Sequence, residues 1–373
     1  MKQDNYNVEA VARACDLLAA FHGPADLVSL GDLALRANLN KVTAFRILAT
    51  LTAKGLVEKV GSRGYRSRFR PVRDKRLSVG YAAQSEVVPF VGTVTESLVT
   101  AALEMDVDLV VLNNRSSRKA AIRNAELLVE RKVDVAIEFQ KISEVAAHVS
   151  SIFQKAGIPL IAVDNPHPEA VYFGADNYKA GRMGGSHLGR WVNQKWRGQA
   201  DEIVLVQSSL NPLLEARMLG IYDGIASILK GTSLIPVHRY DTKGSQERTI
   251  DVIRRHLSRS RSQHILIGTV NDVCALAATA TLREFGREAH GAIVGQDAIV
   301  EARQEMRRPN SRLIGSVAYF PEAYGQRLIR LAMDMAENRH HSQVVFTLHA
   351  LVTPENVDKI YPNDVLMTGR RLG

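Results

Sequence analysis

The chain has 373 residues, which is too long for one ordinary compact domain, and its 46% hydrophobic content is sufficient for two or three globular domains. Two cysteines are too few for a disulfide-stapled secreted scaffold. The first 76 residues hold 14 basic and 7 acidic side chains, whereas the other 297 hold 34 and 32. This asymmetry predicts a small module that binds a polyanion, attached to a larger and nearly neutral one.

The N-terminal segment has early acidic residues and no long apolar stretch, so we expect neither a signal peptide nor a transit peptide. No run of about 18 apolar residues occurs, so we expect no transmembrane helix and no membrane partner. These features predict a cytoplasmic protein. Cys15 and Cys274 both lie in apolar helical patterns, and we expect both thiols to be buried.

A first helix over 8–19 is predicted by apolar residues that recur at helical spacing, namely Val8, Val11, Ala12, Cys15, Leu18 and Ala19. Ser29 and Asn40 are suited to cap helices over 30–37 and 40–54. Two short extended runs, 56–60 and 65–69, flank a Gly-Ser-Arg-Gly turn and predict a β-hairpin. Three helices followed by a basic hairpin predict a winged helix-turn-helix over residues 1–70, with 71–76 as a basic linker.

The third helix of this module has one face for the core and one for a partner. Ala44, Ile47, Leu48 and Leu51 can pack inward. The apolar residues left outside, Val42 and Phe45, suit the thymine methyl groups of a major groove, although a dimer or domain contact would also explain them. Seven cations and one acid within 63–76 favour phosphate contacts. The predicted contacts to double-stranded operator DNA are Lys41, Val42, Thr43, Phe45, Arg46, Arg63, Arg66 and Arg68.

The stretch VARACDLLAAF…SLGDLALRANLNKVTAFRILATLTAKGLVEKV…GYRSRF resembles the DNA-binding domain of IclR-type regulators over about residues 8–70. Asn40 stands where that family often has proline, and Phe45 where it often has histidine. The resemblance therefore implies DNA binding but does not carry over a base specificity.

Beyond residue 76, apolar strands alternate with amphipathic helices, which predicts parallel sheets covered on both faces. The expected strands are 77–83, 109–112, 133–138, 160–163, 203–206, 234–239, 265–267, 292–294 and 313–317. So many strands over 77–373 favour an α/β domain of two similar lobes with a crossover near 164–176. We expect a small ligand in the cleft between the lobes, outside the carboxyl ends of the strands.

Polar residues follow several of these strands at the same predicted edge, among them Gln84, Asn113 and Glu138. Amides, carboxylates and an arginine suit a polyhydroxylated ligand, because each hydroxyl both donates and accepts hydrogen bonds. Phe90 and Tyr319 could stack on the C–H face of a sugar.

This second module resembles the type I periplasmic sugar-binding proteins and the effector domains of the lactose-repressor (LacI) family. The matching segments are AGIPLIAVDN, VYFGADNYKAGRMGG, EARMLGIYDGI, GTVNDVCALAA, AIVGQD and SVAYFPEAYG. The resemblance implies that Arg217, Asn271 and Asp297 bind hydroxyl groups, followed by Asp164 or Asn165. Residues predicted to bind the ligand are Gln84, Phe90, Asn113, Glu138, Asp164, Asn165, Arg217, Asn271, Asp297 and Tyr319.

Together the two modules predict a sugar-responsive transcription regulator, a repressor of carbohydrate uptake or catabolism genes that binds a palindromic operator as a homodimer. A periplasmic transport receptor and a carbohydrate-active enzyme are the alternatives. No phosphate-binding loop or hydrolase motif occurs, and we expect no cofactor and no metal. The glycine-rich run 181–185 lies inside a helical pattern, and His340 and His341 are expected in a surface turn.

Overall fold

The computed structural model describes residues 8–21, 26–62, 64–68, 76–85, 88–140 and 142–364. The chain forms two compact units. Unit 1 comprises Met1–Gln140, Glu144–Val171 and Pro321–Val344, and unit 2 comprises Lys141–Ser143, Tyr172–Phe320 and Val345–Gly373. The chain therefore passes between the units several times, and not only near the predicted crossover at 164–176.

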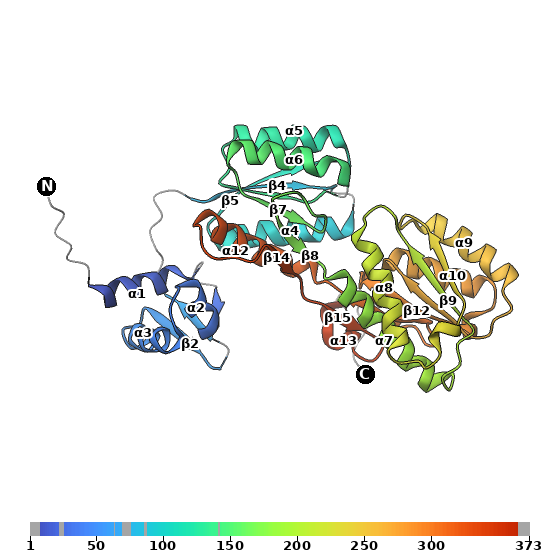
Figure 1. Cartoon of the computed structure of the whole chain (residues 1–373). Helices are drawn as coiled ribbons and strands as arrows, with labels where there is room; N and C mark the ends of the chain where they lie inside the picture. Colours follow the sequence, from blue (N-terminus) through green and yellow to red (C-terminus); the bar gives the residue numbers. More distant parts are fainter. Residues whose placement is uncertain are drawn as a thin grey trace. The chain divides into compact units, whose positions relative to one another are not determined.

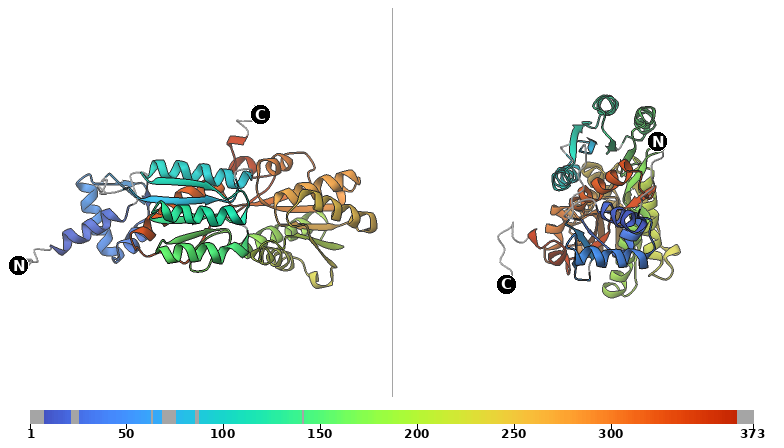
Figure 2. Two further views of the ribbon diagram at one scale, coloured as in Figure 1. Left: turned by 90° about the horizontal axis from the view of Figure 1, so that it is seen from above. Right: turned by 90° about the vertical axis from the view of Figure 1, so that its left-hand side faces the viewer.

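The first module, which lies in unit 1, has the helices and the hairpin that the sequence predicts (Figures 1 and 2). Its helices are α1 (Glu9–Ala19), α2 (Leu30–Arg36) and α3 (Lys41–Ala53). An antiparallel sheet of order β1-β3-β2 contains β1 (Leu27–Val28), β2 (Val57–Val60) and β3 (Gly64–Ser67). Both N-caps are confirmed, since the side chains of Ser29 and Asn40 accept hydrogen bonds from the backbone of α2 and α3. The two-residue β1 was not predicted.

The helix α1 forms as predicted, but the expectation that Cys15 is buried in it is wrong. The helix contacts the core of the module through Leu17, with Leu18 packed against it, and the chain just after the helix adds Ala20 and Phe21. Val8 and Val11 are about 60% exposed (62% and 59%), and Cys15 is exposed too, whereas Cys274 is buried as expected. The error arises because a terminal helix packs against one side only, and helical spacing alone does not tell which of two apolar stripes that side uses.

Parallel strands flanked by helices make up the rest of the chain. The first of two large sheets has the strand order β14-β8-β7-β6-β4-β5. Helices α5 and α6 cover one face of this sheet, and α4 and α12 cover the other (Figure 1). The bounds are β4 (Ser78–Ala83), β5 (Asp108–Asn113), β6 (Val135–Glu138), β7 (Leu160–Val163), β8 (Val171–Gly174), β14 (Val344–Phe346), α4 (Pro89–Glu104), α5 (Arg118–Glu130), α6 (Ser143–Ala156) and α12 (Tyr324–Ala336).

The second sheet has the order β10-β9-β11-β12-β13-β15, with β15 antiparallel to β13. Helices α7 and α8 pack together on one face, and α9 and α10 on the other (Figure 1). The bounds are β9 (Glu202–Gln207), β10 (Val237–Asp241), β11 (Ile265–Thr269), β12 (Gly291–Asp297), β13 (Leu313–Ala318), β15 (Ala350–Val352), α7 (Asn177–Lys195), α8 (Leu213–Ala226), α9 (Gln246–Arg259), α10 (Asp272–Glu284), α11 (Val300–Met306) and α13 (Val357–Ile360).

Nine of the strands in these sheets match predicted ones to within a few residues. The strand expected over 234–239 begins later, at Val237, because Thr232–Leu234 forms a 3₁₀ helix. Strands β8, β14 and β15 were missed. Each has only three or four residues, which is too short for a clear alternation of apolar and polar positions.

Each sheet has the doubly wound arrangement in which strand order reverses next to the first strand. In the first sheet the reversal lies between β4 and β6, and in the second between β9 and β11. Ligands of such sheets bind outside the carboxyl ends of the strands at this reversal. The polar residues that follow β4 and β6, and those near the ends of β9 to β13, therefore lie where a ligand of such a sheet would bind.

Helices α7 and α8 touch along their backbones. A Cβ atom added to Gly181 would overlap the carbonyl oxygen of Arg217, and one added to Gly185 would overlap that of Ile221. Gly220 and Gly224 of α8 approach the backbone of α7 in the same way. The glycine-rich run 181–185 thus lies within a helix, as predicted, and allows two helices to cross closely.

One buried carboxylate joins the first module to the rest of unit 1. Asp26, which is buried, forms an ion pair with Arg36 at 3.1 Å and another with Arg330 of α12 at 3.2 Å. Ion pairs with a buried member are screened by solvent less than exposed ones.

Candidate functional sites

The exposed surface of α3 carries the predicted set of DNA-contacting side chains. Ala44, Leu48 and Leu51 are buried as expected, which leaves the opposite face free. On that face Val42 is 71% exposed and Phe45 49%, while Lys41 and Arg46 are exposed and Thr43 is half-buried. A helix surface that shows two large apolar groups beside two cations fits a groove lined by methyl groups and phosphates.

Arg66 lies in β3 and Arg68 directly after it, and the two side chains differ in exposure to solvent. Arg68 is exposed and lies 3.6 Å from Glu58 on the neighbouring strand, a distance typical of a weak surface ion pair. Arg66 is half-buried. Arg63 lies outside the described residues.

A group of buried polar side chains gathers at the carboxyl ends of β4, β5 and β6 in unit 1. It consists of Gln84, Asn114, Glu138 and Gln140, which we call the unit 1 polar group. Asn114 donates a hydrogen bond of 2.8 Å to Oε1 of Glu138. Among the described residues, Oε1 of Gln84 and Oε2 of Glu138 are buried without a hydrogen-bond partner. Buried polar atoms in this state are rare and indicate that something else completes their hydrogen bonding.

Glu138 is the acidic member of this group, and its pKa is strongly shifted. Burial raises the pKa of its carboxyl to about 8, and the hydrogen bond from Asn114 offsets only part of that effect. At neutral pH the group is therefore mostly protonated, and it can donate as well as accept a hydrogen bond.

Phe90 contacts the edges of two other aromatic rings in unit 1. Its centroid lies 5.7 Å from that of Tyr324 and 6.4 Å from that of Phe139, both in edge-on geometry. The ring is half-buried and takes part in an aromatic cluster, so stacking of its face on a sugar remains a prediction.

The other predicted residues of unit 1 are placed at the expected edge. Asn113 ends β5, where its side chain accepts a hydrogen bond from the backbone of Arg115 and its carbonyl accepts one from Asn124. Asp164 and Asn165 follow β7, and Asp164 has a positive φ of 58°. Asn165 is buried, and Asp164 is half-buried.

In unit 2, Arg217 is the centre of a second buried cluster. Its guanidinium donates to Oδ1 of Asn177 at 3.0 Å and to the carbonyl of Val270, and it lies 5.1 Å from the ring centroid of Tyr319. The hydroxyl of Tyr319 donates to Oε1 of Gln296, whose Nε2 is buried with no partner among the described residues. We call Asn177, Arg217, Gln296 and Tyr319 the unit 2 polar group.

Two predicted residues of unit 2 are engaged in local structure. Asn271 caps α10, since its Oδ1 accepts from the backbone of Cys274 at 2.9 Å, and its Nδ2 donates to the carbonyl of Gly244. Asp297 ends β12 with a φ of 106°, a backbone conformation that is strained for a residue with a side chain. Burial, followed by the nearby Asp297 carboxylate, raises the pKa of Asp272 well above its usual range.

The sequence prediction of site residues omitted four members of these groups: Asn114, Gln140, Asn177 and Gln296. Asn114, Gln140 and Gln296 lie within two residues of predicted positions at strand ends. The recurrence of polar residues at strand ends was therefore a usable signal for these three. Asn177 comes instead from the start of α7, 40 residues before the arginine that it contacts. Only the close crossing of α7 and α8 brings the two together.

Two family profiles match this chain. One, described as a periplasmic binding protein domain, matches residues 79–340, and the other, an IclR helix-turn-helix domain, matches residues 10–61. The longer match is to the periplasmic binding protein domain and does not refer to the lactose repressor. Neither family is one of enzymes. A search of curated proteins gave no match.

Solved structures with a similar fold are ABC transporter solute-binding proteins. One from Actinobacillus succinogenes with bound D-allose has a TM-score of 0.67 and 16% identity, covering 76% of this chain and 100% of that one. One from Mycobacterium smegmatis with bound glycerol has a TM-score of 0.66 and 18% identity, covering 76% and 96%. One from Bacillus halodurans with bound myo-inositol has a TM-score of 0.65 and 16% identity, covering 78% and 99%. Among the described residues, no helix is both long and apolar enough to cross a membrane.

Proposed function

Since the chain belongs to the periplasmic binding protein domain family and also carries an IclR helix-turn-helix domain, we propose that it is a transcription regulator whose DNA binding responds to a sugar or sugar alcohol. The observation that carries this proposal is the presence of both domains on one chain. A transport receptor has no use for a DNA-binding module, and an enzyme would need catalytic groups for which we see no motif.

The polar groups of both units support a neutral polyhydroxylated ligand. The unpartnered acceptor on Gln84, the unpartnered carboxyl oxygen of Glu138 and the unpartnered donor on Gln296 match hydroxyls, which both donate and accept. The guanidinium of Arg217 can hold two vicinal hydroxyls. The ligands in the similar solved structures, D-allose, myo-inositol and glycerol, belong to this chemical class.

Of the residues predicted from the sequence, we retain Gln84, Glu138, Arg217 and Tyr319 as direct ligand contacts, with Asp164, Asn165 and Asp297 beside them. Asn271 and Asn113 are proposed to position the loops that hold these residues, because their side chains are engaged locally. In this proposal the protein binds its ligand without catalysing a reaction of it.

The DNA-binding part uses α3 in the major groove, with Val42, Phe45 and Arg46 facing the bases and backbone and Lys41 and Arg68 facing phosphates. We propose that a homodimer binds a palindromic operator as a repressor. The exposed apolar side chains of Val8, at the N-cap of α1, and Val11, on α1, form one surface that a second copy could cover.

The test combines two measurements on the full chain. A thermal-shift screen against monosaccharides, polyols and sugar acids identifies the ligand, because a ligand that binds the folded state raises the Tm by mass action. Fluorescence anisotropy with DNA from the neighbourhood of the protein's own gene is then recorded with and without that ligand. A ligand-dependent change in the Kd for DNA supports the proposal. Binding of a sugar with no DNA binding at any salt concentration would contradict it.

A further inference from the structure

A second cluster of chemically versatile side chains lies in unit 2, at the opposite end of the sheet from the unit 2 polar group. Glu202 is the first residue of β9, His238 lies near the start of β10, and His256 is in the last turn of α9. Strands β9 and β10 are parallel neighbours with Val204 opposite His238, so Glu202 and His238 project from the same face of the sheet.

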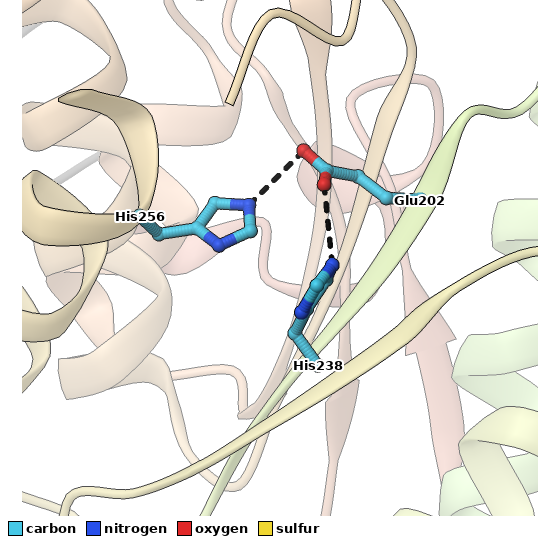
Figure 3. A group of neighbouring side chains, drawn as sticks. All are labelled: Glu202, His238 and His256. Carbon is cyan, nitrogen blue, oxygen red and sulfur yellow. Dashed lines mark hydrogen bonds and ion pairs between the residues drawn. The ribbon is translucent and has the colours of Figure 1, made fainter. Parts of the chain in front are cut away.

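The three side chains converge, as Figure 3 shows. Nε2 of His256 lies 3.0 Å from Oε1 of Glu202, and Nε2 of His238 lies 3.4 Å from Oε2. One ligand atom from each residue can be chosen so that all three lie within 4.8 Å of one another. Zn²⁺ holds nitrogen and oxygen ligands at about 2.0–2.2 Å, so the atoms around it are separated by roughly 3–4 Å. The cluster is therefore close to the required spacing without any ion.

Neighbouring groups orient the cluster in the way that metal sites require. In the ion-free cluster Nε2 of His256 is hydrogen-bonded to the Glu202 carboxylate. A metal ion at Nε2 would replace that hydrogen bond, and the ring proton would then sit on Nδ1, which lies 2.9 Å from the hydroxyl of Tyr240 and can donate to it. Ser260 donates a hydrogen bond of 2.7 Å to Oε1 of Glu202. Second-shell partners of this kind fix the ring tautomer and the carboxylate orientation.

The cluster is also accessible. Glu202, His238, His256, Tyr240 and Ser260 line a surface cavity of about 520 Å³. Glu202 is buried at 5% exposure, whereas the side chain of His238 is 39% exposed, so an ion could enter from the solvent side of His238. Among the described residues, this is the one group of three His, Cys, Asp or Glu side chains with such converging ligand atoms.

The alternative is that Glu202 and the histidines form a buried ion pair without a metal, and two nearby arginines favour it. Arg255 and Arg259 line the same cavity and would oppose a bound cation. The Nε of Arg255 donates to the carbonyl of Asp251, which holds the side chain along its own helix but leaves its positive charge in place. A simple ion pair, however, would need only one histidine, whereas here two imidazoles from different elements meet a single carboxylate.

We propose that Glu202, His238 and His256 form a binding site for a divalent transition-metal ion, with Zn²⁺ the best match. Two nitrogens and one carboxylate oxygen leave at least one coordination position for water. A bound ion would link β9, β10 and α9, and this site is separate from the sugar and DNA contacts proposed above.

The test uses the full chain with any affinity tag removed, stripped of metal with a chelator and then titrated with ZnCl₂ by calorimetry. We expect one Zn²⁺ per chain, a rise in the Tm on Zn²⁺ addition, and tetrahedral d–d absorption bands when Co²⁺ replaces Zn²⁺. His238→Ala should lower the affinity at least about tenfold. Because His238 is half-exposed, this variant should fold, which its metal-free Tm and circular dichroism would verify; Glu202→Gln gives a second, isosteric variant.

The control removes the two adjacent histidines elsewhere, as His340→Ala together with His341→Ala. Zn²⁺ binding that persists in this control and is lost in His238→Ala supports the site. Binding lost in the control but retained in His238→Ala, or no Zn²⁺ binding by the unaltered chain, would overturn it. Neither result bears on sugar or DNA binding, so the proposed function is tested separately.

Discussion

Asn114 donates a 2.8 Å hydrogen bond to Glu138, and both side chains are fully buried. The carboxyl of Glu138 keeps its proton in the folded chain, because burial raises its pKa to about 8 against an ordinary value of 4.5. Between these two pH values the unfolded chain loses a proton that the folded chain retains. Folding stability contributed by this group therefore falls as the pH rises, by roughly 1.4 kcal/mol per pH unit.

Glu138→Gln should remove that pH dependence, since the amide does not ionise and its Oε1 can still accept from Asn114. The Tm of the variant relative to the unaltered chain is expected to rise from pH 5 to pH 8 and to level off above that. Glu126→Gln, an exposed substitution on α5, is the control and should show no such trend. A constant Tm difference for Glu138→Gln across this range would show that the carboxyl is ionised in the folded chain.

Arg217→Ala should abolish or strongly reduce the sugar-induced thermal shift. A hydrogen bond from a charged donor is worth about 1.5–3 kcal/mol, which corresponds to a loss of roughly 10- to 100-fold in affinity. Binding to DNA without sugar should persist. Arg239→Ala, an exposed arginine of the same unit, is the matched control. An unchanged shift in Arg217→Ala, with a normal Tm, would remove Arg217 from the sugar site.

Arg46→Ala should weaken DNA binding and leave the sugar-induced thermal shift unaltered. Loss of one phosphate contact is expected to reduce the slope of log Kd against log salt concentration by about 1. Arg131→Ala removes an equal charge from a turn after α5 and should change neither the Kd nor the slope. Equal effects of the two substitutions would mean that Arg46 acts only through net charge.

Gly185→Ala should destabilise the chain, because the added methyl group would overlap the carbonyl oxygen of Ile221 where α7 crosses α8. Overpacking of this kind costs about 1–3 kcal/mol. Gly184→Ala is the neighbouring control: its Cβ would come no nearer than 3.5 Å to another group, and alanine favours a helix. Thermal melts of the two variants should therefore move in opposite directions.

Arg330→Met should reduce the effect of sugar on DNA affinity while sugar binding itself persists. The guanidinium pairs with Asp26 of the first module, and the same helix carries Tyr324 against Phe90. The measurement is the ratio of the DNA Kd values with and without sugar. A ratio equal to that of the unaltered chain would show that this ion pair has no part in the response.

The first module shows how far local sequence signals reach. The N-caps Ser29 and Asn40 and the inward residues of α3 were predictable, because capping and helical spacing act within a few residues. The side of α1 that packs inward was not, since both of its stripes are apolar. Strand β1 was missed because it exists only by pairing with β3, almost 40 residues later.

In the candidate sites too, residues with a local sequence signal were predictable and residues brought together by long-range contacts were not. Gln84 and Glu138 were found because strand ends in a parallel sheet converge at one edge. Arg217 and Asp297 were predicted as ligand contacts from the family resemblance. Asn177 becomes visible only in the structure, as does the meeting of Glu202 with two histidines 36 and 54 residues further along the chain. Long-range contacts of this sort leave no periodic trace in the sequence.

The backbone contact between α7 and α8 has a consequence for the role proposed for Arg217 in ligand binding. Asn177 stands at the start of one helix and Arg217 on the other, and the two helices approach closely at glycines, which have no side chains to rearrange. The hydrogen-bonding direction of the guanidinium is thus set before any ligand arrives, and little conformational entropy remains to be lost on binding. Selectivity at this position would then come from a fixed template, which accepts hydroxyls in one stereochemical arrangement and excludes epimers that place them elsewhere.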